Sequence, residues 1–211
     1  MADVRQEMCE VVEELYRLSL ITATGGNVSA RCQDDPGSAW ITPRGLFKGA
    51  LSPQIMARMD NRGRPFAGSG STPSSESKIH AAILSARPDL QAVVHCHPPH
   101  ATVLVNSDLP FLPISTEAAF LAEIGRIPFV MPGTDELAEA IVDALGKGWA
   151  VLMQNHGLIV GARSLRRAAD ITQIVERTAE IIVGCYAVGR PPPVLPEALV
   201  KELAAKTDLM A

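Results

Sequence analysis

The sequence lacks three features that would point away from a cytoplasmic protein. Its four cysteines, Cys9, Cys32, Cys96 and Cys185, form no CxxC pair, which fits a reducing compartment better than a disulfide framework. No uninterrupted apolar run approaches the ~18 residues that a membrane-spanning helix requires. The N-terminus is charged from Asp3 onward and lacks the apolar core of a signal peptide. We therefore expect a cytoplasmic protein that does not interact with a membrane.

The sequence also lacks the marks of a protein that binds nucleic acid or nucleotides. Its formal net charge is −4 and its pI is near 5.7, and its densest basic group is the short set Arg163, Arg166 and Arg167. Binding to a phosphate backbone depends on clustered Lys and Arg side chains, so a nucleic-acid partner is not expected. No Walker-type or GxGxxG pattern is present, so nothing indicates a nucleotide.

What the sequence does contain is enough apolar residues for one core. With 211 residues, of which 47% are hydrophobic, we expect a single domain over residues 1–211. Apolar periodicity predicts helices over residues 3–20, 74–86, 135–146, 165–188 and 196–206, and strands over residues 27–31, 39–42, 55–59, 92–97, 150–153 and 158–160. This alternation predicts an α/β fold in which helices cover a sheet.

Two histidines of the predicted strand 92–97 lie on one of its faces. Successive side chains of a strand point to opposite faces, so His95 and His97 project together, while Cys96 projects into the opposite, packed face. Two buried imidazoles without partners would cost roughly 1–3 kcal/mol each. A metal ion would satisfy both, but an HxH pair alone is weak evidence, so the prediction depends on further ligands.

A third imidazole is available in the turn Asn155-His156-Gly157, between two predicted strands. This turn is suited to presenting His156 toward a neighbouring strand. Three nitrogen ligands with an open fourth position form the donor set of a catalytic Zn²⁺. The candidate metal ligands are therefore His95, His97 and His156.

Glu76 lies at the start of the predicted helix 74–86, where Ser74 or Ser75 would be the N-cap and Glu76 would fall in the first turn. A glutamate at this place commonly complements the helix dipole at the surface. Beside a divalent cation, however, it is a candidate general base. His80, one turn along the helix, is most simply a core residue or a residue behind the metal ligands.

Three polar segments supply the parts of an anion site. The segments 24–27, 42–45 and Ser74-Ser75 offer hydroxyls, an amide and exposed backbone N–H groups, which bind anions at a loop or a helix N-terminus. They predict a site for a single phosphate. His100, just after the histidine pair, is interpreted as lining the pocket rather than as a ligand.

Five short motifs occur in the order, and close to the spacing, of one known family. They are Gly26-Asn27-Val28-Ser29, Ile41-Thr42-Pro43, Pro73-Ser74-Ser75-Glu76, His95-Cys96-His97 and Asn155-His156-Gly157-Leu158. Together they span almost the whole chain and resemble the class II aldolase/adducin family. The resemblance implies a three-layer sandwich, in which helices cover both faces of a central, mainly antiparallel sheet. It also implies a homotetramer with active sites at subunit interfaces.

The resemblance assigns roles to residues of this chain. The metal ligands of the family correspond to His95, His97 and His156. Zn²⁺ is the expected metal, with Mn²⁺, Co²⁺ or Fe²⁺ as alternatives, because three imidazoles suit all of them. Glu76 would be the acid/base and a fourth ligand before substrate binds. The phosphate-binding positions correspond to Asn27, Gly45, Ser74 and Ser75.

The reaction implied by the resemblance is retro-aldol cleavage of a ketose 1-phosphate to dihydroxyacetone phosphate and an aldehyde. Arg44 replaces a hydroxyl residue of the family's phosphate loop, and would bind phosphate, face a neighbouring subunit or meet a carboxylate. Some of these aldolases bring a tyrosine to the aldehyde end of the substrate. The corresponding position of this chain falls near Ile114, where there is no tyrosine. We therefore expect a less hydroxylated substrate, a 5-deoxy- or 5-methylthio-pentulose 1-phosphate rather than fuculose 1-phosphate. Glu117 is either a polar residue of this pocket or an exposed loop charge.

Other reactions of the same family remain as alternatives. Decarboxylation of a sugar-acid phosphate, through the same kind of enediolate, is the first of them, because Arg44 would receive an acidic substrate. Epimerases typically carry aspartate in place of Glu76, and dehydratases and iron-dependent oxygenases share the fold. Adducin-like interaction modules lack the metal ligands, so the three histidines and Glu76 argue against a non-enzymatic interaction module.

Overall fold

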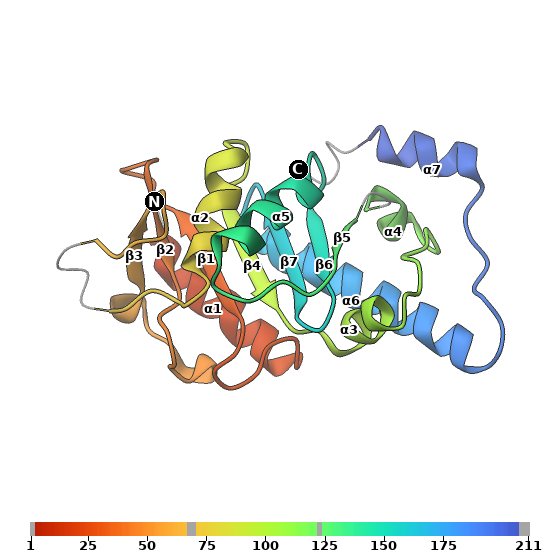
Figure 1. Ribbon diagram of the computed structural model, residues 1–211, viewed down its shortest axis with the longest axis horizontal. Helices are drawn as coiled ribbons and strands as arrows, with labels where there is room; N and C mark the ends of the chain where they lie inside the picture. The colour runs from red at the N-terminus through yellow and green to blue at the C-terminus, as the bar shows by residue number, and fades with distance from the viewer. Residues whose placement is uncertain (1–2, 67–70, 122–123, 207–211) are drawn as a thin grey trace.

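A seven-stranded sheet runs through the computed structural model of the protein, which describes residues 3–66, 71–121 and 124–206 (Figure 1). The strands are β1 (Asn27–Arg31), β2 (Ser38–Ile41), β3 (Ala57–Asp60), β4 (Ala92–Cys96), β5 (Gly125–Ile127), β6 (Ala150–Met153) and β7 (Gly157–Ala162). Their order across the sheet is β3-β2-β1-β4-β7-β6-β5. Every neighbouring pair among them is antiparallel except β5 and β6, which are parallel. The expected mainly antiparallel sheet is thus confirmed.

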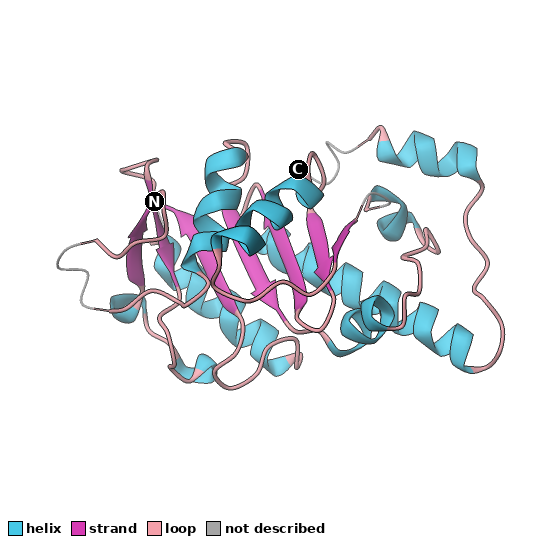
Figure 2. Ribbon diagram, viewed as in Figure 1, coloured by secondary structure: helices cyan, strands magenta, loops and turns pink. Residues whose placement is uncertain are grey.

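Helices cover both faces of the sheet, which confirms the expected three layers (Figure 2). The helices are α1 (Val4–Arg17), α2 (Ser77–Ala86), α3 (Pro99–Asn106), α4 (Thr116–Phe120), α5 (Asp135–Leu145), α6 (Leu165–Ala187) and α7 (Glu197–Ala204), with the short 3-10 helices η1 (Lys48–Ala50) and η2 (Pro53–Ile55). Helices α2 and α5 pack together on one face, and α6 packs with α1 and α3 on the other. Within the described ranges, no helix is both long and apolar enough to cross a bilayer.

Side-chain caps fix where four of the helices begin, namely α1, α4, α5 and α6. Asp3 Oδ1 accepts a hydrogen bond from the backbone N–H of Arg5 at the start of α1, over 3.0 Å, and the Thr134 side chain caps α5 in the same way. Such caps satisfy N–H groups that have no partner inside the helix. Helix α1 ends at Arg17, short of the predicted end at residue 20, and the chain turns at Ser19, whose φ of 58° is left-handed.

Strand β4 lies at the centre of the sheet between β1 and β7, and all of its residues are buried. Its register with β7 pairs His95 with Ile159 and Cys96 with Leu158. The turn that precedes β7 therefore lies beside the end of β4. Because the apolar side chains of β4 belong to the continuous core, the strand is a rigid base for the residues at its C-terminal end.

Candidate active site

Three histidine side chains converge where β4 ends. Their nitrogen atoms that could bind a metal lie within 4.8 Å of one another. His95 lies in β4, His97 follows the strand directly, and His156 comes from the turn between β6 and β7. The ring centroid of His95 lies 4.7 Å from that of His97 and 4.8 Å from that of His156. Cys96 is buried in the core, as expected, and burial raises the pKa of its thiol.

The hydrogen bonds of His95 leave one of its nitrogens available to a metal. Its side chain is completely buried, and Nδ1 lies 3.0 Å from the carbonyl oxygen of Leu158. A carbonyl only accepts, so Nδ1 carries the proton and Nε2 presents a lone pair. Among the described residues, Nε2 of His95 and Nδ1 of His156 are buried without a hydrogen-bond partner. Such atoms are rare in folded proteins, and a divalent metal fits this donor set.

The His97 ring occupies space left by two glycines. A Cβ at Gly157 would lie 2.9 Å from Cδ2 of His97, and a Cβ at Gly25 would lie 3.3 Å from Nδ1. Burial, followed by the neighbouring His95 and His156, lowers the pKa of His97 to about 4. The ring is therefore neutral at pH 7, which is the form in which imidazole binds metals.

Glu76 faces two of these histidines from the start of α2. Its Oε1 lies 3.0 Å from Nε2 of His156, and its Oε2 lies 3.1 Å from Nε2 of His95. Burial opposes ionisation of the carboxyl group. The contact with His156 and a hydrogen bond from Asn27 outweigh burial and hold the pKa of Glu76 well below its usual range. The group is thus a carboxylate at neutral pH, able to accept a proton or to bind a metal.

The predicted position of Glu76 inside the first helical turn is wrong. Glu76 is itself the N-cap residue of α2, which begins at Ser77, and its side chain makes no cap hydrogen bond. Ser74 Oγ instead accepts the Glu76 N–H over 3.3 Å, ahead of the helix, so neither Ser74 nor Ser75 is the N-cap. Because an N-cap residue has non-helical backbone angles, the Glu76 side chain is free to reach the histidines.

A chain of hydrogen bonds connects β1 and α2 to the Glu76 carboxylate. Nδ2 of Asn27 donates to Oε2 of Glu76 over 2.8 Å. Oδ1 of the same amide lies 2.5 Å from Nε2 of His80, and Nδ1 of His80 lies 2.7 Å from Oγ of Ser29. An amide oxygen only accepts, so Nε2 of His80 donates, and Nδ1 accepts from the Ser29 hydroxyl. Burial lowers the pKa of His80 to about 3, which keeps the ring neutral, as this arrangement requires.

The role of His80 was not evident from the sequence, and neither was the bond between Asn27 and Glu76. His80 follows Glu76 by four positions, the spacing that places two side chains on one face of a helix, and this spacing was the available signal. No local sequence pattern indicated the hydrogen bond from Asn27 to Glu76, since these residues are 49 positions apart in the chain.

Two of the segments predicted to bind phosphate lie side by side. Pro43 and Pro73 form an antiparallel β-bridge, which brings the loop 42–45 beside the segment that leads into α2. The predicted phosphate-binding residues are Asn27 and Ser74, which are buried, and Gly45 and Ser75, which are exposed. Arg44 is exposed as well. The structure thus brings these residues to one end of the sheet, and their contact with phosphate remains a prediction.

A lysine that the sequence analysis did not single out is buried against this loop. Lys48, in η1, is 2% exposed, and its Nζ donates a hydrogen bond to the carbonyl oxygen of Pro43 over 3.2 Å. Burial lowers the pKa of Lys48 to about 8. The ammonium group is therefore still charged at pH 7, and its burial costs the folded state free energy.

Replacing Lys48 with methionine is expected to stabilise the folded protein at pH 7. Lowering the pKa from 10.5 to about 8 corresponds to a cost of up to ~3 kcal/mol, and the lost hydrogen bond to Pro43 offsets about 1 kcal/mol of the gain. Between these two pKa values the unfolded chain binds more protons, so the wild type gains stability as the pH rises. The advantage of Lys48→Met is therefore largest at pH 7 and shrinks toward pH 9.5.

Urea unfolding of both proteins at the two pH values measures this difference. Lys78→Met is the matched control, because Lys78 is an exposed lysine whose side chain pairs with Asp135, and such a pair contributes little. A Lys48→Met protein that is less stable than the wild type at pH 7 would show that the buried charge carries no such cost.

His100 lies outside the histidine cluster. Its Nδ1 and its backbone N–H both contact Oε1 of Glu176, at 2.8 and 3.0 Å, and Oε2 of Glu176 accepts the N–H of Ala101 over 2.9 Å. A carboxylate from α6 therefore caps the start of α3. The structure places His100 at this junction between two helices, and not among the residues around Glu76.

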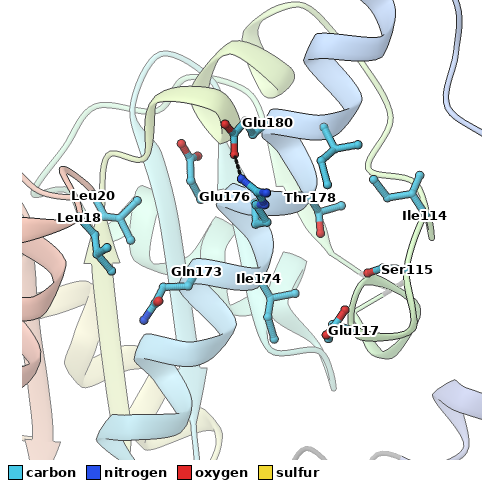
Figure 3. Close-up of a pocket in the computed structure, with 12 residues that line it drawn as sticks. Leu18, Leu20, Ile114, Ser115, Glu117, Gln173, Ile174, Glu176, Thr178 and Glu180 are labelled. Carbon is cyan, nitrogen blue, oxygen red and sulfur yellow. Dashed lines mark hydrogen bonds and ion pairs between the residues drawn. The ribbon is translucent and has the colours of Figure 1, made fainter.

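A cavity of about 480 Å³ lies beside α6 (Figure 3). Its lining includes Leu18, Leu20, Ile114, Glu117 and Ile181. Figure 3 shows the two leucines and the pair Ile114 and Glu117 on opposite sides of it. Within one chain, the residues predicted for the aldehyde end therefore line a cavity to which none of the three histidines contributes.

The chain matches known proteins over most of its length. A family model described as the class II aldolase and adducin N-terminal domain matches residues 6–183. A 5-methylthioribulose-1-phosphate/5-deoxyribulose-1-phosphate aldolase of Escherichia coli O45:K1 is 30% identical over 195 residues, 92% of this chain and 89% of the relative. An L-fuculose phosphate aldolase of Escherichia coli K12 is 34% identical over 192 residues, 90% of this chain and 87% of the relative. A solved structure of an L-fuculose 1-phosphate aldolase has a TM-score of 0.87 at 30% identity and covers 99% of this chain and 97% of its own.

Proposed function

Since the chain belongs to the class II aldolase and adducin family, we propose that it cleaves a ketose 1-phosphate by a metal-dependent retro-aldol reaction to dihydroxyacetone phosphate and an aldehyde. One observation carries the proposal: the ionised Glu76 carboxylate lies 3.0 and 3.1 Å from two of three converging imidazoles. Cleavage of a carbon–carbon bond next to a carbonyl requires a group that moves a proton beside a group that stabilises negative charge.

The three histidines would hold the metal. Zn²⁺ is the favoured ion because it takes three nitrogen donors and leaves a position open, with Mn²⁺, Co²⁺ and Fe²⁺ as alternatives. The support is the buried Nε2 of His95, which has no hydrogen-bond partner among the described residues. When bound, a divalent metal supplies a Lewis acid that stabilises the negative charge on the substrate oxygens. Glu76 lies close enough to His95 and His156 to act as a fourth donor before substrate binds.

Glu76 would move the proton. The bond between C3 and C4 of the ketose breaks when the C4 hydroxyl loses its proton and becomes the aldehyde carbonyl. The bonding electrons form an enediolate, and C3 then takes up a proton to give dihydroxyacetone phosphate. Asn27 fixes Oε2 of the Glu76 carboxylate, whereas Oε1 lies 3.0 Å from Nε2 of His156 and receives no hydrogen bond from an amide. Oε1 is therefore the oxygen that would exchange the proton.

The phosphate group would bind at the end of the sheet where the predicted anion-binding segments meet. The proposed contacts are Asn27, Gly45, Ser74 and Ser75. The arrangement that supports them is the bridge between Pro43 and Pro73, beside the N-terminal end of α2, because N–H groups at such an end bind anions. Arg44, exposed on the same loop, would add a positive charge.

A 5-deoxy- or 5-methylthio-pentulose 1-phosphate is the favoured substrate. The only tyrosines of the chain are Tyr16 and Tyr186, so none stands near Ile114 in the sequence, and part of the cavity around Ile114 is an apolar surface formed by Leu18, Leu20, Ile114, Ile174 and Ile181. Such a surface suits an aldehyde half that carries a methyl or methylthio group rather than hydroxyls. Sequence identity does not decide the matter, because the L-fuculose phosphate aldolase is at least as similar as the 5-methylthioribulose-1-phosphate aldolase.

A homotetramer would complete the site. Within one chain, Ile114 and Glu117 line a cavity apart from the histidines, so their contribution to the reaction would go to a neighbouring subunit. Leu18 and Ile181, on the same cavity, are 48% and 43% exposed, as expected of apolar residues at an interface. Light scattering should give four times the chain mass of 22.5 kDa, and a monomer would contradict this assembly.

Product analysis tests the reaction and the substrate. The Zn²⁺-loaded protein is supplied with 5-methylthioribulose 1-phosphate, 5-deoxyribulose 1-phosphate and fuculose 1-phosphate, and dihydroxyacetone phosphate is measured with a coupled dehydrogenase. Preference for fuculose 1-phosphate would overturn the favoured substrate but not the reaction. Release of CO₂ from a 3-oxo-acid phosphate, with no aldehyde from any ketose, would establish the decarboxylase alternative instead.

Replacing His80, whose Nε2–H orients the amide of Asn27, is expected to slow the reaction. In His80→Phe the amide loses the hydrogen bond that holds its Nδ2 toward Glu76, so we expect kcat to fall about 10–100-fold with the metal still bound. His80→Gln keeps an N–H donor and should recover part of kcat. If His80→Phe lowers kcat by the same factor in an Asn27→Ala background, then His80 does not act through Asn27.

A further inference from the structure

Lys48 is a buried cation that the proposed reaction leaves unused. Its backbone N–H donates to the carbonyl oxygen of Ala23 over 2.8 Å, which fixes η1 against the loop before β1. An ammonium group has three N–H donors, and the hydrogen bond that Nζ makes goes to the neutral carbonyl of Pro43. Burial alone accounts for the lowered pKa of Lys48, and no carboxylate of the described residues compensates its charge.

The carbonyl that Lys48 contacts lies between two parts of the proposed phosphate site. The Thr42 N–H donates to the carbonyl of Val28 over 3.0 Å, and Thr42 Oγ1 accepts the Val28 N–H over 3.2 Å. These bonds continue the register of β1 and β2, so Pro43 lies beside Asn27. On its other side Pro43 pairs with Pro73, in the segment that leads into α2.

The position of Lys48 makes its charge effective toward an anion. The low local dielectric that makes a buried ammonium group costly also strengthens its attraction to a nearby anion. Arg44 lies on the same loop but is exposed, so solvent and salt screen its charge. A bound phosphate would therefore recover with Lys48 the free energy that burial of the ammonium costs the folded protein.

We propose that Lys48 supplies the buried positive charge of the phosphate site and thereby sets the preference of the chain for phosphorylated over unphosphorylated sugars. The inference rests on the proposed function, because it presupposes a phosphate bound between the loops at Asn27, Gly45 and Ser74. It assigns a binding role to a residue that belongs to none of the sequence motifs.

Calorimetric titration of inorganic phosphate into the Zn²⁺-loaded protein tests this role. We expect Lys48→Met to weaken phosphate binding at least 10-fold, whereas Lys78→Met, at an exposed lysine, should bind as the wild type does. Urea unfolding of the Lys48→Met protein shows whether it is folded, so that weaker binding is separated from misfolding. Lys48→Gln serves as the second neutral variant if the methionine protein does not fold.

The possible outcomes distinguish a failure of the role of Lys48 from a failure of the proposed aldolase function. A wild type that binds phosphate, together with Lys48 variants that bind it equally well, would overturn the role of Lys48 and leave the phosphate site in place. A wild type that binds neither inorganic phosphate nor a phosphorylated ketose would overturn both. Weaker binding in Lys48→Met and Lys48→Gln, but not in Lys78→Met, would support the inference.

Discussion

Replacing Glu76 with glutamine is expected to lower kcat about 10²–10⁴-fold, the range that a general acid–base group contributes. Glutamine has almost the same shape as glutamate but can neither accept nor return the proton. The pKa of Glu76 lies well below its usual range, so the wild-type group is ionised throughout the neutral range. Steady-state kinetics with the best substrate of the ketose panel measure the change, and metal analysis shows whether the ion is still bound.

The control for this variant is Glu136→Gln, at an exposed acidic residue in the first turn of α5. It removes the same charge away from the histidines and should leave kcat unchanged. If Glu76→Gln retains more than about a tenth of wild-type kcat, a change too small for the loss of the proton carrier, then Glu76 is not that carrier. The low pKa would then reflect only its contacts with the histidines.

Replacing His97 with alanine is expected to abolish stoichiometric metal binding and, with it, turnover. His97 supplies one of the three nitrogens that lie within 4.8 Å of one another, and two imidazoles leave a divalent ion without its usual set of donors. Loss of a group that only supports a ligand costs 10–100-fold in metal affinity, so loss of a ligand should cost at least about 100-fold. Elemental analysis and competition with a chelating dye measure the affinity.

His100→Ala is the matched control, since it removes an imidazole three positions away that contacts Glu176 instead of the cluster. It should keep one equivalent of metal. A His97→Ala protein with a full equivalent of metal would exclude the three-histidine centre. Reloading the stripped wild type with Zn²⁺, Mn²⁺, Co²⁺ or Fe²⁺ in turn identifies the ion that restores activity.

Local patterns predicted most of the elements but not their arrangement. The strands 27–31 and 150–153 were predicted with the bounds of β1 and β6, because each is an apolar run of strand length between turns. Strand β5 was missed, since its three residues, Gly125–Ile127, are too few to show a period. It pairs in parallel with β6, from which it is separated in the sequence by helix α5. The order of the strands depends on such distant pairs, which no short window of sequence contains.

The candidate site was predictable to the same degree. Alternation along a strand places His95 and His97 together, and this reasoning needs only adjacent residues. The bond from Asn27 to Glu76 and the burial of Lys48 depend on segments brought together by the sheet. Both features could therefore be identified only from the three-dimensional structure.

The carboxylate of Glu176 ties two distant regions to each other. It caps the backbone of α3 just after His97 and also lines the cavity beside α6. A group that filled this cavity would contact Glu176, which holds the start of α3 three residues after the candidate ligand His97. Linkage of this kind is reciprocal: if association of subunits at the cavity tightens metal binding, metal binding strengthens the association by the same factor.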